Sequence, residues 1–382
     1  MKKNLIVLIA FGAFSGAALA QSNVTLYGLI DVNFQYNDPK GAGQSSTRGV
    51  NSGHQSGSLW GVRGSEALGG GWSAVFTLEG GYSADTGVQA HGGRLFGRQA
   101  WAGLASRFGT VVAGRVSPFS AATGSFDLFA NATPFVLWGD SSLSSTFTSV
   151  LMRIDNSVLY RTPNLGGFQF GAGYSSNANG TEAAGSGNNN RVTFLGANFT
   201  RGPFFAVVTY DIIDVNDAGI AGSATTPAIF RDASDQTHLQ IGAAFDLKFL
   251  KIHGAYARER NVYLTTTFGI QPDAGADADA WMLGVTVPLL GGQLLAAYQD
   301  RDGDPARVCL AGLNAIGICT VPVASQPIRE RDLKVWAVGY AYPLSRRTNL
   351  YANVSDRNGE KFVNNDATID RRQYTVGLRH LF

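Results

Sequence analysis

About sixteen segments of alternating apolar and polar residues follow one another along this 382-residue chain. In the first, from Val24 to Tyr36, the even-numbered residues are apolar or glycine, and the odd-numbered ones include Thr25, Asp31 and Asn33. Such alternation is typical of a β-strand with one apolar and one polar face. The segments are Val24–Tyr36, Ser58–Glu66, Trp72–Tyr82, Leu95–Leu104, Thr110–Val116, Arg153–Thr162, Phe168–Ser175, Arg191–Thr200, Phe204–Ile213, Gln236–Leu247, Lys251–Arg260, Ala280–Pro288, Gln293–Asp300, Asp332–Leu344, Asn349–Arg357 and Arg371–Phe382. Their regular recurrence predicts an all-β protein.

The connections between these segments are of two kinds, which alternate along the chain. The short ones are Ala67–Gly71, Ala105–Gly109, Pro163–Gly167, Arg201–Pro203, Leu289–Gly292 and Ser345–Thr348. The long, polar ones are Asn37–Gly57, Ser83–Arg94, Ser176–Asn190, Asp214–Asp235, Asn261–Asp279, Arg301–Arg331 and Asn358–Asp370. A transmembrane β-barrel has short turns at one end and long loops at the other, whereas a soluble sandwich has no reason to sort its connections in this way. We therefore predict a closed 16-stranded antiparallel barrel, because closure removes the strand edges that lipid cannot satisfy.

Composition also favours strands, rather than helices, as the membrane-crossing elements. The chain contains 48 glycines, 23 phenylalanines and 13 tyrosines, which are residues of tight turns and β-surfaces. Beyond the N-terminal segment, no stretch approaches the ~18 consecutive apolar residues that indicate a spanning helix. Without Lys2 and Lys3 the chain carries 28 basic and 28 acidic residues. This neutral balance argues against a nucleic-acid partner.

The first 20 residues have the pattern of a secretory signal peptide. Lys2 and Lys3 precede an apolar run, which ends in the small-residue sequence Ala18-Leu19-Ala20. The alternative, a membrane anchor, is disfavoured because the run is shorter than the roughly 20 residues of a spanning helix. We expect residues 1–20 to be removed on export and residues 21–382 to form the barrel domain.

The stretch from Ser117 to Met152 differs from every other connection. Asp127 and Asp140 are its only charged residues. Its large aromatic residues are Phe119, Phe126, Phe129, Phe135, Trp138 and Phe147. A loop of this length is usually functional, and so many aromatic side chains in water would form an unfavourable exposed patch. We therefore expect this stretch to lie inside the barrel, with its aromatic side chains against the inner wall.

Motifs spread over the whole mature chain resemble those of a known family. They include Val24-Thr25-Leu26-Tyr27-Gly28, Arg63-Gly64-Ser65-Glu66-Ala67-Leu68-Gly69-Gly70-Gly71, Phe108-Gly109-Thr110 leading to Gly114-Arg115, Asp155-Asn156-Ser157-Val158, Thr162-Pro163-Asn164-Leu165-Gly166-Gly167-Phe168, and the ending Gly377-Leu378-Arg379-His380-Leu381-Phe382. With these motifs the chain resembles the Gram-negative trimeric general-diffusion porins, in particular their betaproteobacterial and neisserial branch.

The resemblance implies a cell outer-membrane location, reached by export through the periplasm, and a homotrimer. It implies that the third extracellular loop, residues 117–152, is folded into the pore. The implied partners are outer-membrane lipid and lipopolysaccharide, small hydrophilic solutes and ions, and the barrel assembly machinery. Phe382 is then the aromatic C-terminal residue used in assembly. No cofactor is expected.

Arginines inside the strands are expected to face the lumen, because an arginine facing lipid at mid-membrane costs about 2–4 kcal/mol. Alternation then places Arg63 inward and Trp60 outward. It places Arg98 and Trp101 on opposite faces. We likewise expect Arg161 to point inward.

Further assignments come from position and from the family resemblance. Arg98 and Arg153 match constriction arginines of the family, and Arg115 matches the arginine that follows glycine at the base of the third loop. Alternation gives Arg115 the inward partners Val111 and Ala113. Where the family usually has an arginine in the second strand, this chain has Leu59-Trp60-Gly61, and Arg63, two residues further on, partly replaces it.

These residues predict a constriction that is more basic than acidic. Phe135 stands where enterobacterial relatives carry a glutamate. The predicted constriction comprises Arg63, Arg98, Arg115, Arg153, Arg161, Asp127, Asp140 and Phe135. Because a few charges along a narrow, partly desolvated passage bias ion flow, we expect a mild preference for anions. The alternative is that the arginines pair with acids deeper in the barrel, which leaves the pore nearly non-selective.

Two other function classes remain as alternatives. A substrate-selective channel, for sugars or an anionic solute, has the same architecture, and block of the current by its substrate would distinguish it. An outer-membrane barrel enzyme such as a phospholipase needs a Ser–His pair at the lipid-facing rim, and no motif marks one. We therefore expect a channel rather than an enzyme, with no catalytic residues.

The remaining candidate chemistry lies mainly in one long connection. Cys309 and Cys319 are the only cysteines and predict a disulfide, because an exported chain folds in an oxidising compartment. Asp300–Asp304 resembles the start of a calcium loop, but the position that needs a bidentate glutamate is Ala311. A loosely held divalent ion there remains open. The five histidines lack metal-ligand spacing, so we expect no metal site from them.

Overall fold

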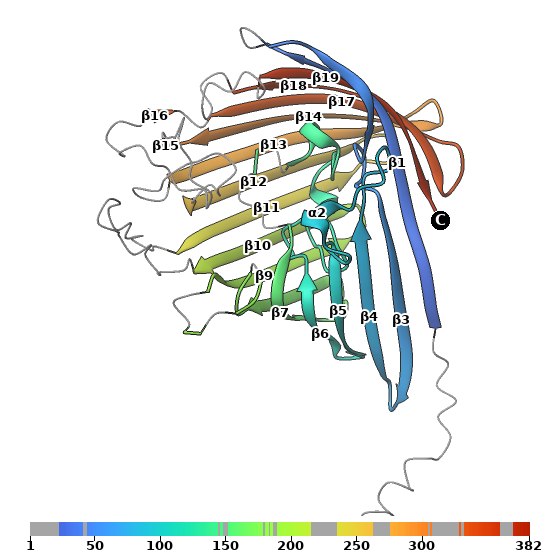
Figure 1. Ribbon diagram of the computed structural model, residues 1–382, viewed down its shortest axis with the longest axis vertical. Helices are drawn as coiled ribbons and strands as arrows, with labels where there is room; N and C mark the ends of the chain where they lie inside the picture. The colour runs from blue at the N-terminus through green and yellow to red at the C-terminus, as the bar shows by residue number, and fades with distance from the viewer. Residues whose placement is uncertain are drawn as a thin grey trace, which may run out of the picture.

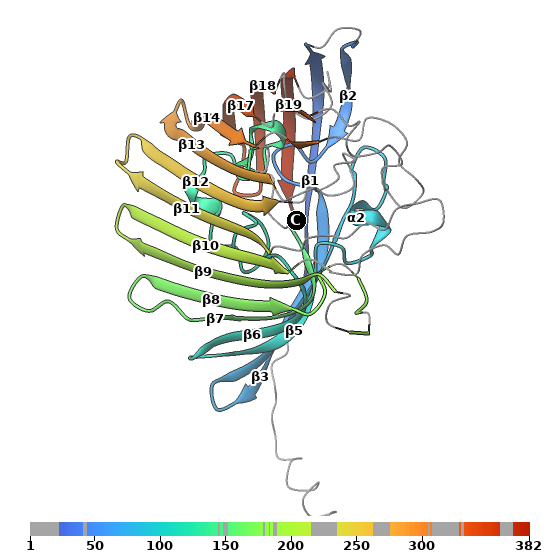
Figure 2. The ribbon, with the colours of Figure 1, turned by 90° about the vertical axis from the view of Figure 1, so that its left-hand side faces the viewer.

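Sixteen long antiparallel strands form one closed barrel, which Figures 1 and 2 show from two sides. The computed structural model describes residues 23–40, 44–143, 146–147, 152–178, 180–182, 184–185, 189–214, 235–262, 276–304, 306–307, 328–329, 332–359 and 370–382. The barrel strands are β1 (Asn23–Pro39), β3 (Leu59–Gly69), β4 (Trp72–Gly81), β5 (Gln99–Ser106), β6 (Gly109–Val116), β7 (Ile154–Arg161), β8 (Phe168–Ser175), β9 (Arg191–Arg201), β10 (Phe204–Asp214), β11 (Gln236–Asp246), β12 (Lys251–Val262), β13 (Ala276–Leu289), β14 (Gly292–Gly303), β17 (Leu333–Pro343), β18 (Thr348–Asn358) and β19 (Arg371–Leu381). The predicted fold class is confirmed.

The first and last strands pair to close the barrel. β1 and β19 form a continuous antiparallel ladder from Leu29 opposite Leu381 to Pro39 opposite Arg371. The ladder continues at the C-terminal residue, since Gly28 and Phe382 exchange two backbone hydrogen bonds of 3.0 Å. The barrel therefore has no unpaired edge along this seam.

Three short strands lie outside the ring of sixteen. β2 (Thr47–Ser52) pairs with the upper part of β1, so the predicted loop 37–57 is partly strand. The reason is that β3 pairs with β1 only as far as Leu29, and β2 pairs with the same edge of β1 from Val32 to Asn37. β15 (Ala306–Arg307) and β16 (Ile328–Arg329) pair with each other. Asp300 and Gly303 belong to β14, so most of the calcium-loop-like stretch is strand rather than loop.

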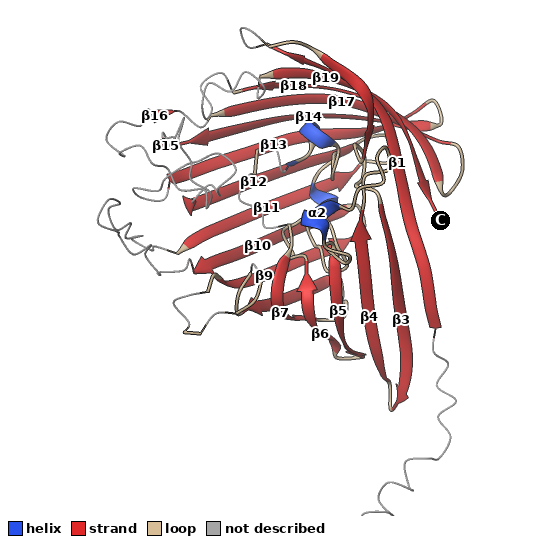
Figure 3. Ribbon diagram, viewed as in Figure 1, coloured by secondary structure: helices blue, strands red, loops and turns tan. Residues whose placement is uncertain are grey.

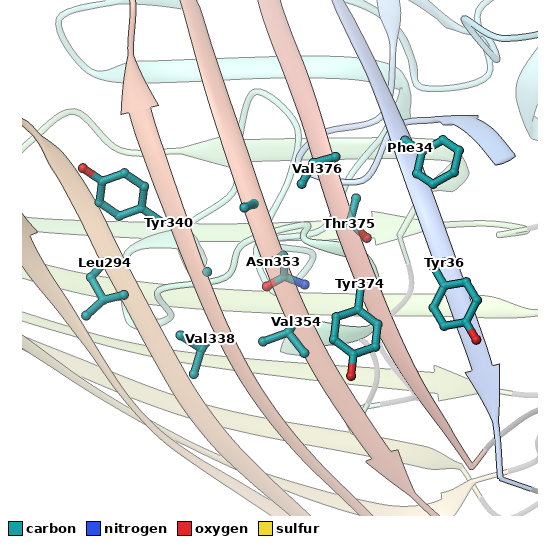
Figure 4. Close-up of a pocket in the computed structure, with 12 residues that line it drawn as sticks. Phe34, Tyr36, Leu294, Val338, Tyr340, Asn353, Val354, Tyr374, Thr375 and Val376 are labelled. Atoms are coloured by element: carbon teal, nitrogen blue, oxygen red, sulfur yellow. The ribbon is translucent and has the colours of Figure 1, made fainter. Parts of the chain in front are cut away.

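Alternation along the strands separates an apolar outer wall from an inner wall. In β17, Trp336 and Val338 are 38% and 40% exposed on the outside, while Val335 and Ala337 are buried on the inside. Figure 4 shows part of this outer wall, where side chains of β1, β14, β17, β18 and β19, among them Leu294, line a shallow apolar groove. The outer wall is thus suited to lipid or to another apolar surface.

Short turns join the strands at one end of the barrel, and the strand ends that the long connections join lie at the other. The β3–β4 turn is built from Gly69, Gly70 and Gly71, with φ of +86°, +59° and +79°. Three consecutive positive φ values require glycine, because side chains with a Cβ rarely adopt that conformation. The predicted sorting of the connections is therefore present in the folded chain.

Helical structure in the described residues is limited to short turns, drawn in blue in Figure 3. They are α2 (Ala90–Gly93) and two 3-10 helices, η1 (Ala130–Ala132) and η2 (Gly139–Ser141). Among the described residues, no helix is both long and apolar enough to cross a membrane. Both 3-10 helices belong to the stretch Ser117–Met152, which is called the inner loop from here on.

Candidate pore constriction

The inner loop runs along the inside of the barrel wall, and its teal trace lies within the curve of the strands in Figure 2. The aromatic side chains singled out in the sequence are all at most 5% exposed: Phe119, Phe126, Phe129, Phe135, Trp138 and Phe147. They belong to one core together with inward-facing residues of the strands. The expectation that they pack against the inner wall is confirmed. Their burial is the main apolar contribution that holds the loop inside.

Polar side chains of three strands fasten the inner loop to the wall. Ser120 donates a 2.6 Å hydrogen bond from Oγ to Asp211 on β10. Gln299 on β14 donates from Nε2 to the Ser141 carbonyl at 2.7 Å. Asn353 on β18 donates from Nδ2 to Ser141 Oγ at 2.9 Å. The loop is therefore tied to the wall at widely separated strands.

Asp140, in η2, forms the most highly charged of these attachments. Arg371 donates two hydrogen bonds of 2.6 Å, from Nε and Nη2, to the Asp140 carboxylate. Arg357 donates a third, of 3.1 Å. Burial opposes ionisation of Asp140, but the hydrogen bonds and charges of these arginines outweigh burial, and its pKa lies below the ordinary value of 3.8. Asp140 is therefore ionised and neutralised at neutral pH.

The partners of Asp140 were missed in the sequence. The arginines predicted to share the constriction with it belong to β3, β6 and β7 or precede β5 and β7, whereas its actual partners lie at the loop end of β18 and β19. One signal was available, since Arg357 ends one predicted strand and Arg371 begins the next, and the two are paired in the β18–β19 register. Which arginine a loop carboxylate reaches, however, depends on the course of the loop through the barrel.

Asp127 has a local role in the inner loop. Its carboxylate accepts hydrogen bonds from the backbone N–H groups of Phe129, at 3.1 Å, and Ala130, at 2.9 Å, at the start of η1. Burial raises the pKa of Asp127, and the hydrogen bonds offset only part of this effect, so that the pKa is about 6. Asp127 is thus engaged by the loop itself. Nearby, Arg161 donates to the Ser125 carbonyl at 3.3 Å and lies 5.2 Å from the centroid of the Phe126 ring.

A buried ion pair lies beneath the end of the inner loop. Arg301 on β14 donates from Nη1 to Glu259 on β12 at 2.7 Å, and to the Thr146 carbonyl at 2.8 Å. The side chains of Arg301 and Glu259 are 0% and 2% exposed. This attachment couples the loop to two neighbouring parts of the wall.

Phe135 does not line the pore, so this part of the prediction is wrong. Its side chain is fully buried, at 0% exposure, and lies edge-on to Trp138 with ring centroids 5.5 Å apart. It packs against Gly339 on β17. The apolar ring turns toward the wall because burial stabilises it there.

A group of basic residues lies on the wall near β4. Arg98 donates a 2.6 Å hydrogen bond to Glu79 on β4, and both side chains are at most 10% exposed. Burial and the charge of Arg98 lower the pKa of Arg153 to about 9, which still leaves Arg153 charged at pH 7. Burial and the charges of Arg153, Arg98 and Arg115 lower the pKa of His91 to about 4. The arginines of this group outnumber the carboxylates that pair with them, Glu79 and Asp155.

Two assignments based on alternation are wrong near this group. Trp101 was placed opposite Arg98, on the outer face, but it points inward, with its ring 5.1 Å from that of Phe126. Arg98 precedes β5, so strand alternation does not apply to it. Val111 and Ala113 were expected to face inward, but both are exposed on the outside.

Arg115 does not face the carboxylates of the inner loop. It follows Gly114, where the pairing of β6 with β7 shifts register. Its Nε donates to the Gly97 carbonyl at 2.8 Å, and Nη1 binds Asp155. Asp155 also accepts a 2.7 Å hydrogen bond from Arg94. The register shift redirects Arg115 into this ion-pair cluster, away from its predicted position opposite the loop.

Arg63 lies inward, as alternation predicts. Its guanidinium carbon is 5.1 Å from the centroid of Tyr27, which in turn donates a 2.9 Å hydrogen bond to Glu79. The side chain remains exposed. Arg63 is thus on the same side of the wall as the Arg98–Glu79 pair.

The connection between β2 and β3 also folds inward, which the sequence did not reveal. His54 is 3% exposed and stacks on Tyr351 with ring centroids 5.9 Å apart. It is edge-on to Trp138 at 6.3 Å, and its Nε2 lies 3.1 Å from Asn353 Nδ2. Burial lowers the pKa of His54 to about 4. The side chain is therefore neutral at pH 7 and joins a second loop to the inner loop.

Lowering the pH from 7 to about 4.5 is expected to loosen the His54 contact. The pKa of His54 is about 4 when its ring is buried, against an ordinary value of 6.5. Burial therefore favours the neutral ring, so the contact is fully stable above pH 6.5 and weakens as the pH falls toward 4. We expect more frequent brief closures in single-channel recordings at pH 4.5 than at pH 7. His54→Gln should reduce this pH dependence. Asp127, which titrates near pH 6, is present in both proteins. An equal pH response in the two proteins would contradict the role of His54.

Several predictions fall outside the described residues. These are the signal peptide, residues 1–20, and the disulfide between Cys309 and Cys319. In the part of the chain that the structure describes, no group of three or more His, Cys, Asp or Glu residues is arranged to hold a metal ion.

A closed membrane-type barrel with a loop attached along its inner wall defines a transmembrane channel. The sequence pattern of the Gram-negative porin family matches residues 5–361. The chain is 32% identical to an outer membrane porin protein of Bordetella pertussis, over all of both chains. It is 30% identical to outer membrane porin protein 32 of Delftia acidovorans, over 93% of this chain and 89% of that one. The chain therefore belongs to the Gram-negative porin family: it is an outer-membrane channel and not an enzyme.

Solved structures support the fold. An anion-selective porin from Comamonas acidovorans superimposes with a TM-score of 0.70 at 23% identity, covering 95% of this chain and all of that one. OmpT of Vibrio cholerae, in its trimer form, gives a TM-score of 0.60 at 16% identity, covering 94% of this chain and 99% of that one. At these identities the likeness bears on the fold alone.

Proposed function

We propose that this porin is a water-filled channel for the passive diffusion of small hydrophilic solutes and ions, with a mild preference for anions. The observation that carries the proposal is an imbalance of charge at the inner loop and the facing wall. Both carboxylates of the loop are engaged: Asp140 by Arg357 and Arg371, and Asp127 by backbone N–H groups. They do not offset the basic group on the wall.

The acids beside the basic group are Glu79 and Asp155, and Asp155 pairs with Arg94 and Arg115. Glu79 accepts from Arg98, and burial and the charge of Arg98 lower the pKa of Arg153. Arg63 adds a further exposed guanidinium on the same side. Two unit charges 4 Å apart interact by about 4 kcal/mol at an effective dielectric of 20, against about 1 kcal/mol in bulk water. Anions are therefore favoured in the narrow part of the channel. The Comamonas relative is described as an anion-selective porin, in line with this proposal.

Neutralising Arg153 is expected to reduce the preference for anions. In Arg153→Gln we expect the chloride-to-potassium permeability ratio to fall by about twofold, which is roughly 0.4 kcal/mol, because mobile ions screen most of the local field. The permeability ratio follows from the zero-current potential of a planar bilayer under a salt gradient. Arg107→Gln, which removes an exposed arginine at the short-turn end, serves as the matched control. Equal ratios in both variants would argue against the basic group as the source of selectivity.

The outer wall and the C-terminal residue bear on how the protein assembles. We infer that three copies associate through their apolar outer walls, that the remaining wall contacts outer-membrane lipid and lipopolysaccharide, and that the barrel assembly machinery recognises Phe382. Phe382 supports this inference, since it is 47% exposed at the closing seam. The Vibrio cholerae relative was solved in a trimer form. A monomeric mass for the native protein in mild detergent would rule out the trimer.

A further inference from the structure

Five glycines of the inner wall lie directly behind the inner loop. They come from strands spread over half of the barrel: Gly171 on β8, Gly196 on β9, Gly242 on β11, Gly284 on β13 and Gly339 on β17. We call them the glycine seat. At each of them, the Cβ of any other residue would collide with an atom of the inner loop.

The space at every position of the seat is too small for a side chain, and a Cβ on Gly171 would lie only 2.2 Å from Cζ of Phe119. A Cβ on Gly242 would lie 2.4 Å from the Cβ of Ala132. One on Gly284 would lie 2.7 Å from Cγ of Pro134, and one on Gly339 would lie 2.9 Å from Cε1 of Phe135. Carbon atoms in contact normally stay about 3.5–4.0 Å apart. The inner loop therefore lies closer to the backbone of these strands than a side chain would allow.

Glycine at the seat is not required by backbone conformation. None of the five has the positive φ that makes glycine necessary at Gly69 in the β3–β4 turn. Glycine within a strand weakens that strand, because it leaves no side chain to pack and loses more conformational freedom on folding. Space for the loop is thus the physical reason for these residues.

Little free space remains between the loop and the wall beside Gly242. A gap between them, lined in part by Phe129, Phe147 and Gln240, has a volume of only about 10 Å³, which is barely enough for one water molecule. The strands are held in place by their ladders, whereas the loop borders the open lumen. Any atom added to the wall here must therefore move the loop toward the lumen.

We propose that the glycine seat sets the depth of the inner loop and thereby the cross-section of the pore. The five glycines are positioning residues. They affect the passage of solute by setting the position of the loop, and they do not touch the solute. This inference builds on the channel function and does not depend on the sign of its ion selectivity. It predicts that a single methyl group on the wall, hidden behind the loop, narrows the channel.

The test is Gly242→Ala, studied by single-channel conductance of the purified protein in planar bilayers. The collision with Ala132 requires the loop to move by about 1 Å, so we expect conductance to fall by roughly a fifth or more. Ala132→Gly in the same chain removes the opposing methyl group and should restore most of the wild-type conductance. Rescue distinguishes a steric effect on the loop from a general effect on the strand.

Gly254→Ala on the adjacent strand β12 is the matched control. Its Cβ would meet only ordinary contacts, with Leu283 Cδ2 at 3.8 Å and the Met282 carbonyl at 4.0 Å. We expect wild-type conductance from this variant. Gly284→Ala, which opposes Pro134, should narrow the pore as Gly242→Ala does.

Each outcome bears on the proposal. Wild-type conductance in both Gly242→Ala and Gly284→Ala would overturn it, because the wall would then have yielded instead of the loop. If Gly242→Ala fails to fold, recovery of a folded channel of wild-type conductance by Ala132→Gly supports the seat. Failure of the double variant as well would contradict it.

Discussion

Replacing Arg301 by methionine is expected to destabilise the folded barrel strongly and to lower the urea concentration at which it unfolds. Arg301 is completely buried, pairs with Glu259 and donates to the Thr146 carbonyl of the inner loop. Removing one partner of a buried ion pair costs about 3–5 kcal/mol, because the other charge remains in a medium of low dielectric. This is a large fraction of the roughly 5–15 kcal/mol that stabilises a typical domain. The folded fraction in a urea titration of the detergent-solubilised protein measures the loss.

A second substitution and a surface control make this prediction specific. Arg301→Met combined with Glu259→Gln removes both charges and should recover much of the stability, since replacing a buried pair by neutral groups is often tolerated. Arg258→Met removes an exposed partner 3.8 Å from Asp279 and should have almost no effect. If Arg301→Met were as stable as Arg258→Met, the buried pair would not be holding the loop and wall together.

Asp140→Asn is expected to make the channel noisy and more selective for anions. The substitution removes the carboxylate that Arg357 and Arg371 both bind. We expect a cost of about 2 kcal/mol, less than for a fully buried pair, because the Arg371 side chain is 29% exposed. A change of this size alters the population of a detached loop by roughly 30-fold. We expect frequent brief closures in single-channel recordings. We also expect a larger chloride-to-potassium permeability ratio.

Asp246→Asn is the matched control for this variant. Asp246 lies at the short-turn end, where its carboxylate accepts a 2.7 Å hydrogen bond from the Lys248 N–H. The substitution Asp246→Asn removes the same charge as Asp140→Asn, but far from the inner loop. Single-channel recordings of Asp246→Asn should therefore match those of the wild type. Quiet recordings and an unchanged permeability ratio in Asp140→Asn would show that the Asp140 attachment neither holds the loop nor neutralises its charge.

The barrel itself was predictable from the sequence because its causes are local. A strand between lipid and lumen needs alternation of period two, and this alternation is visible in single segments such as Val24–Tyr36. The unequal connections then identify the two ends of the barrel. The enclosure of the inner loop was also predictable, since its aromatic residues exceed what a solvated loop can carry.

The details of the constriction were not predictable, because they depend on contacts between distant segments. Alternation failed at Trp101, because Arg98 precedes the strand, and at Arg115, where a register shift intervenes. The partners of Asp140 lie more than 200 residues away in the chain. Phe135 turned toward the wall because a glycine on β17 leaves room for it. Such choices follow from the path of the loop, which no local pattern encodes.

The sign of the zero-current potential tests the central claim most directly. The wild-type channel, in a planar bilayer with a tenfold gradient of potassium chloride, should show a potential whose sign reports faster passage of chloride than of potassium. The basic group around Arg98 and Arg153, together with a neutralised inner loop, requires that sign. A potential of the opposite sign, reporting faster passage of potassium, would contradict the account.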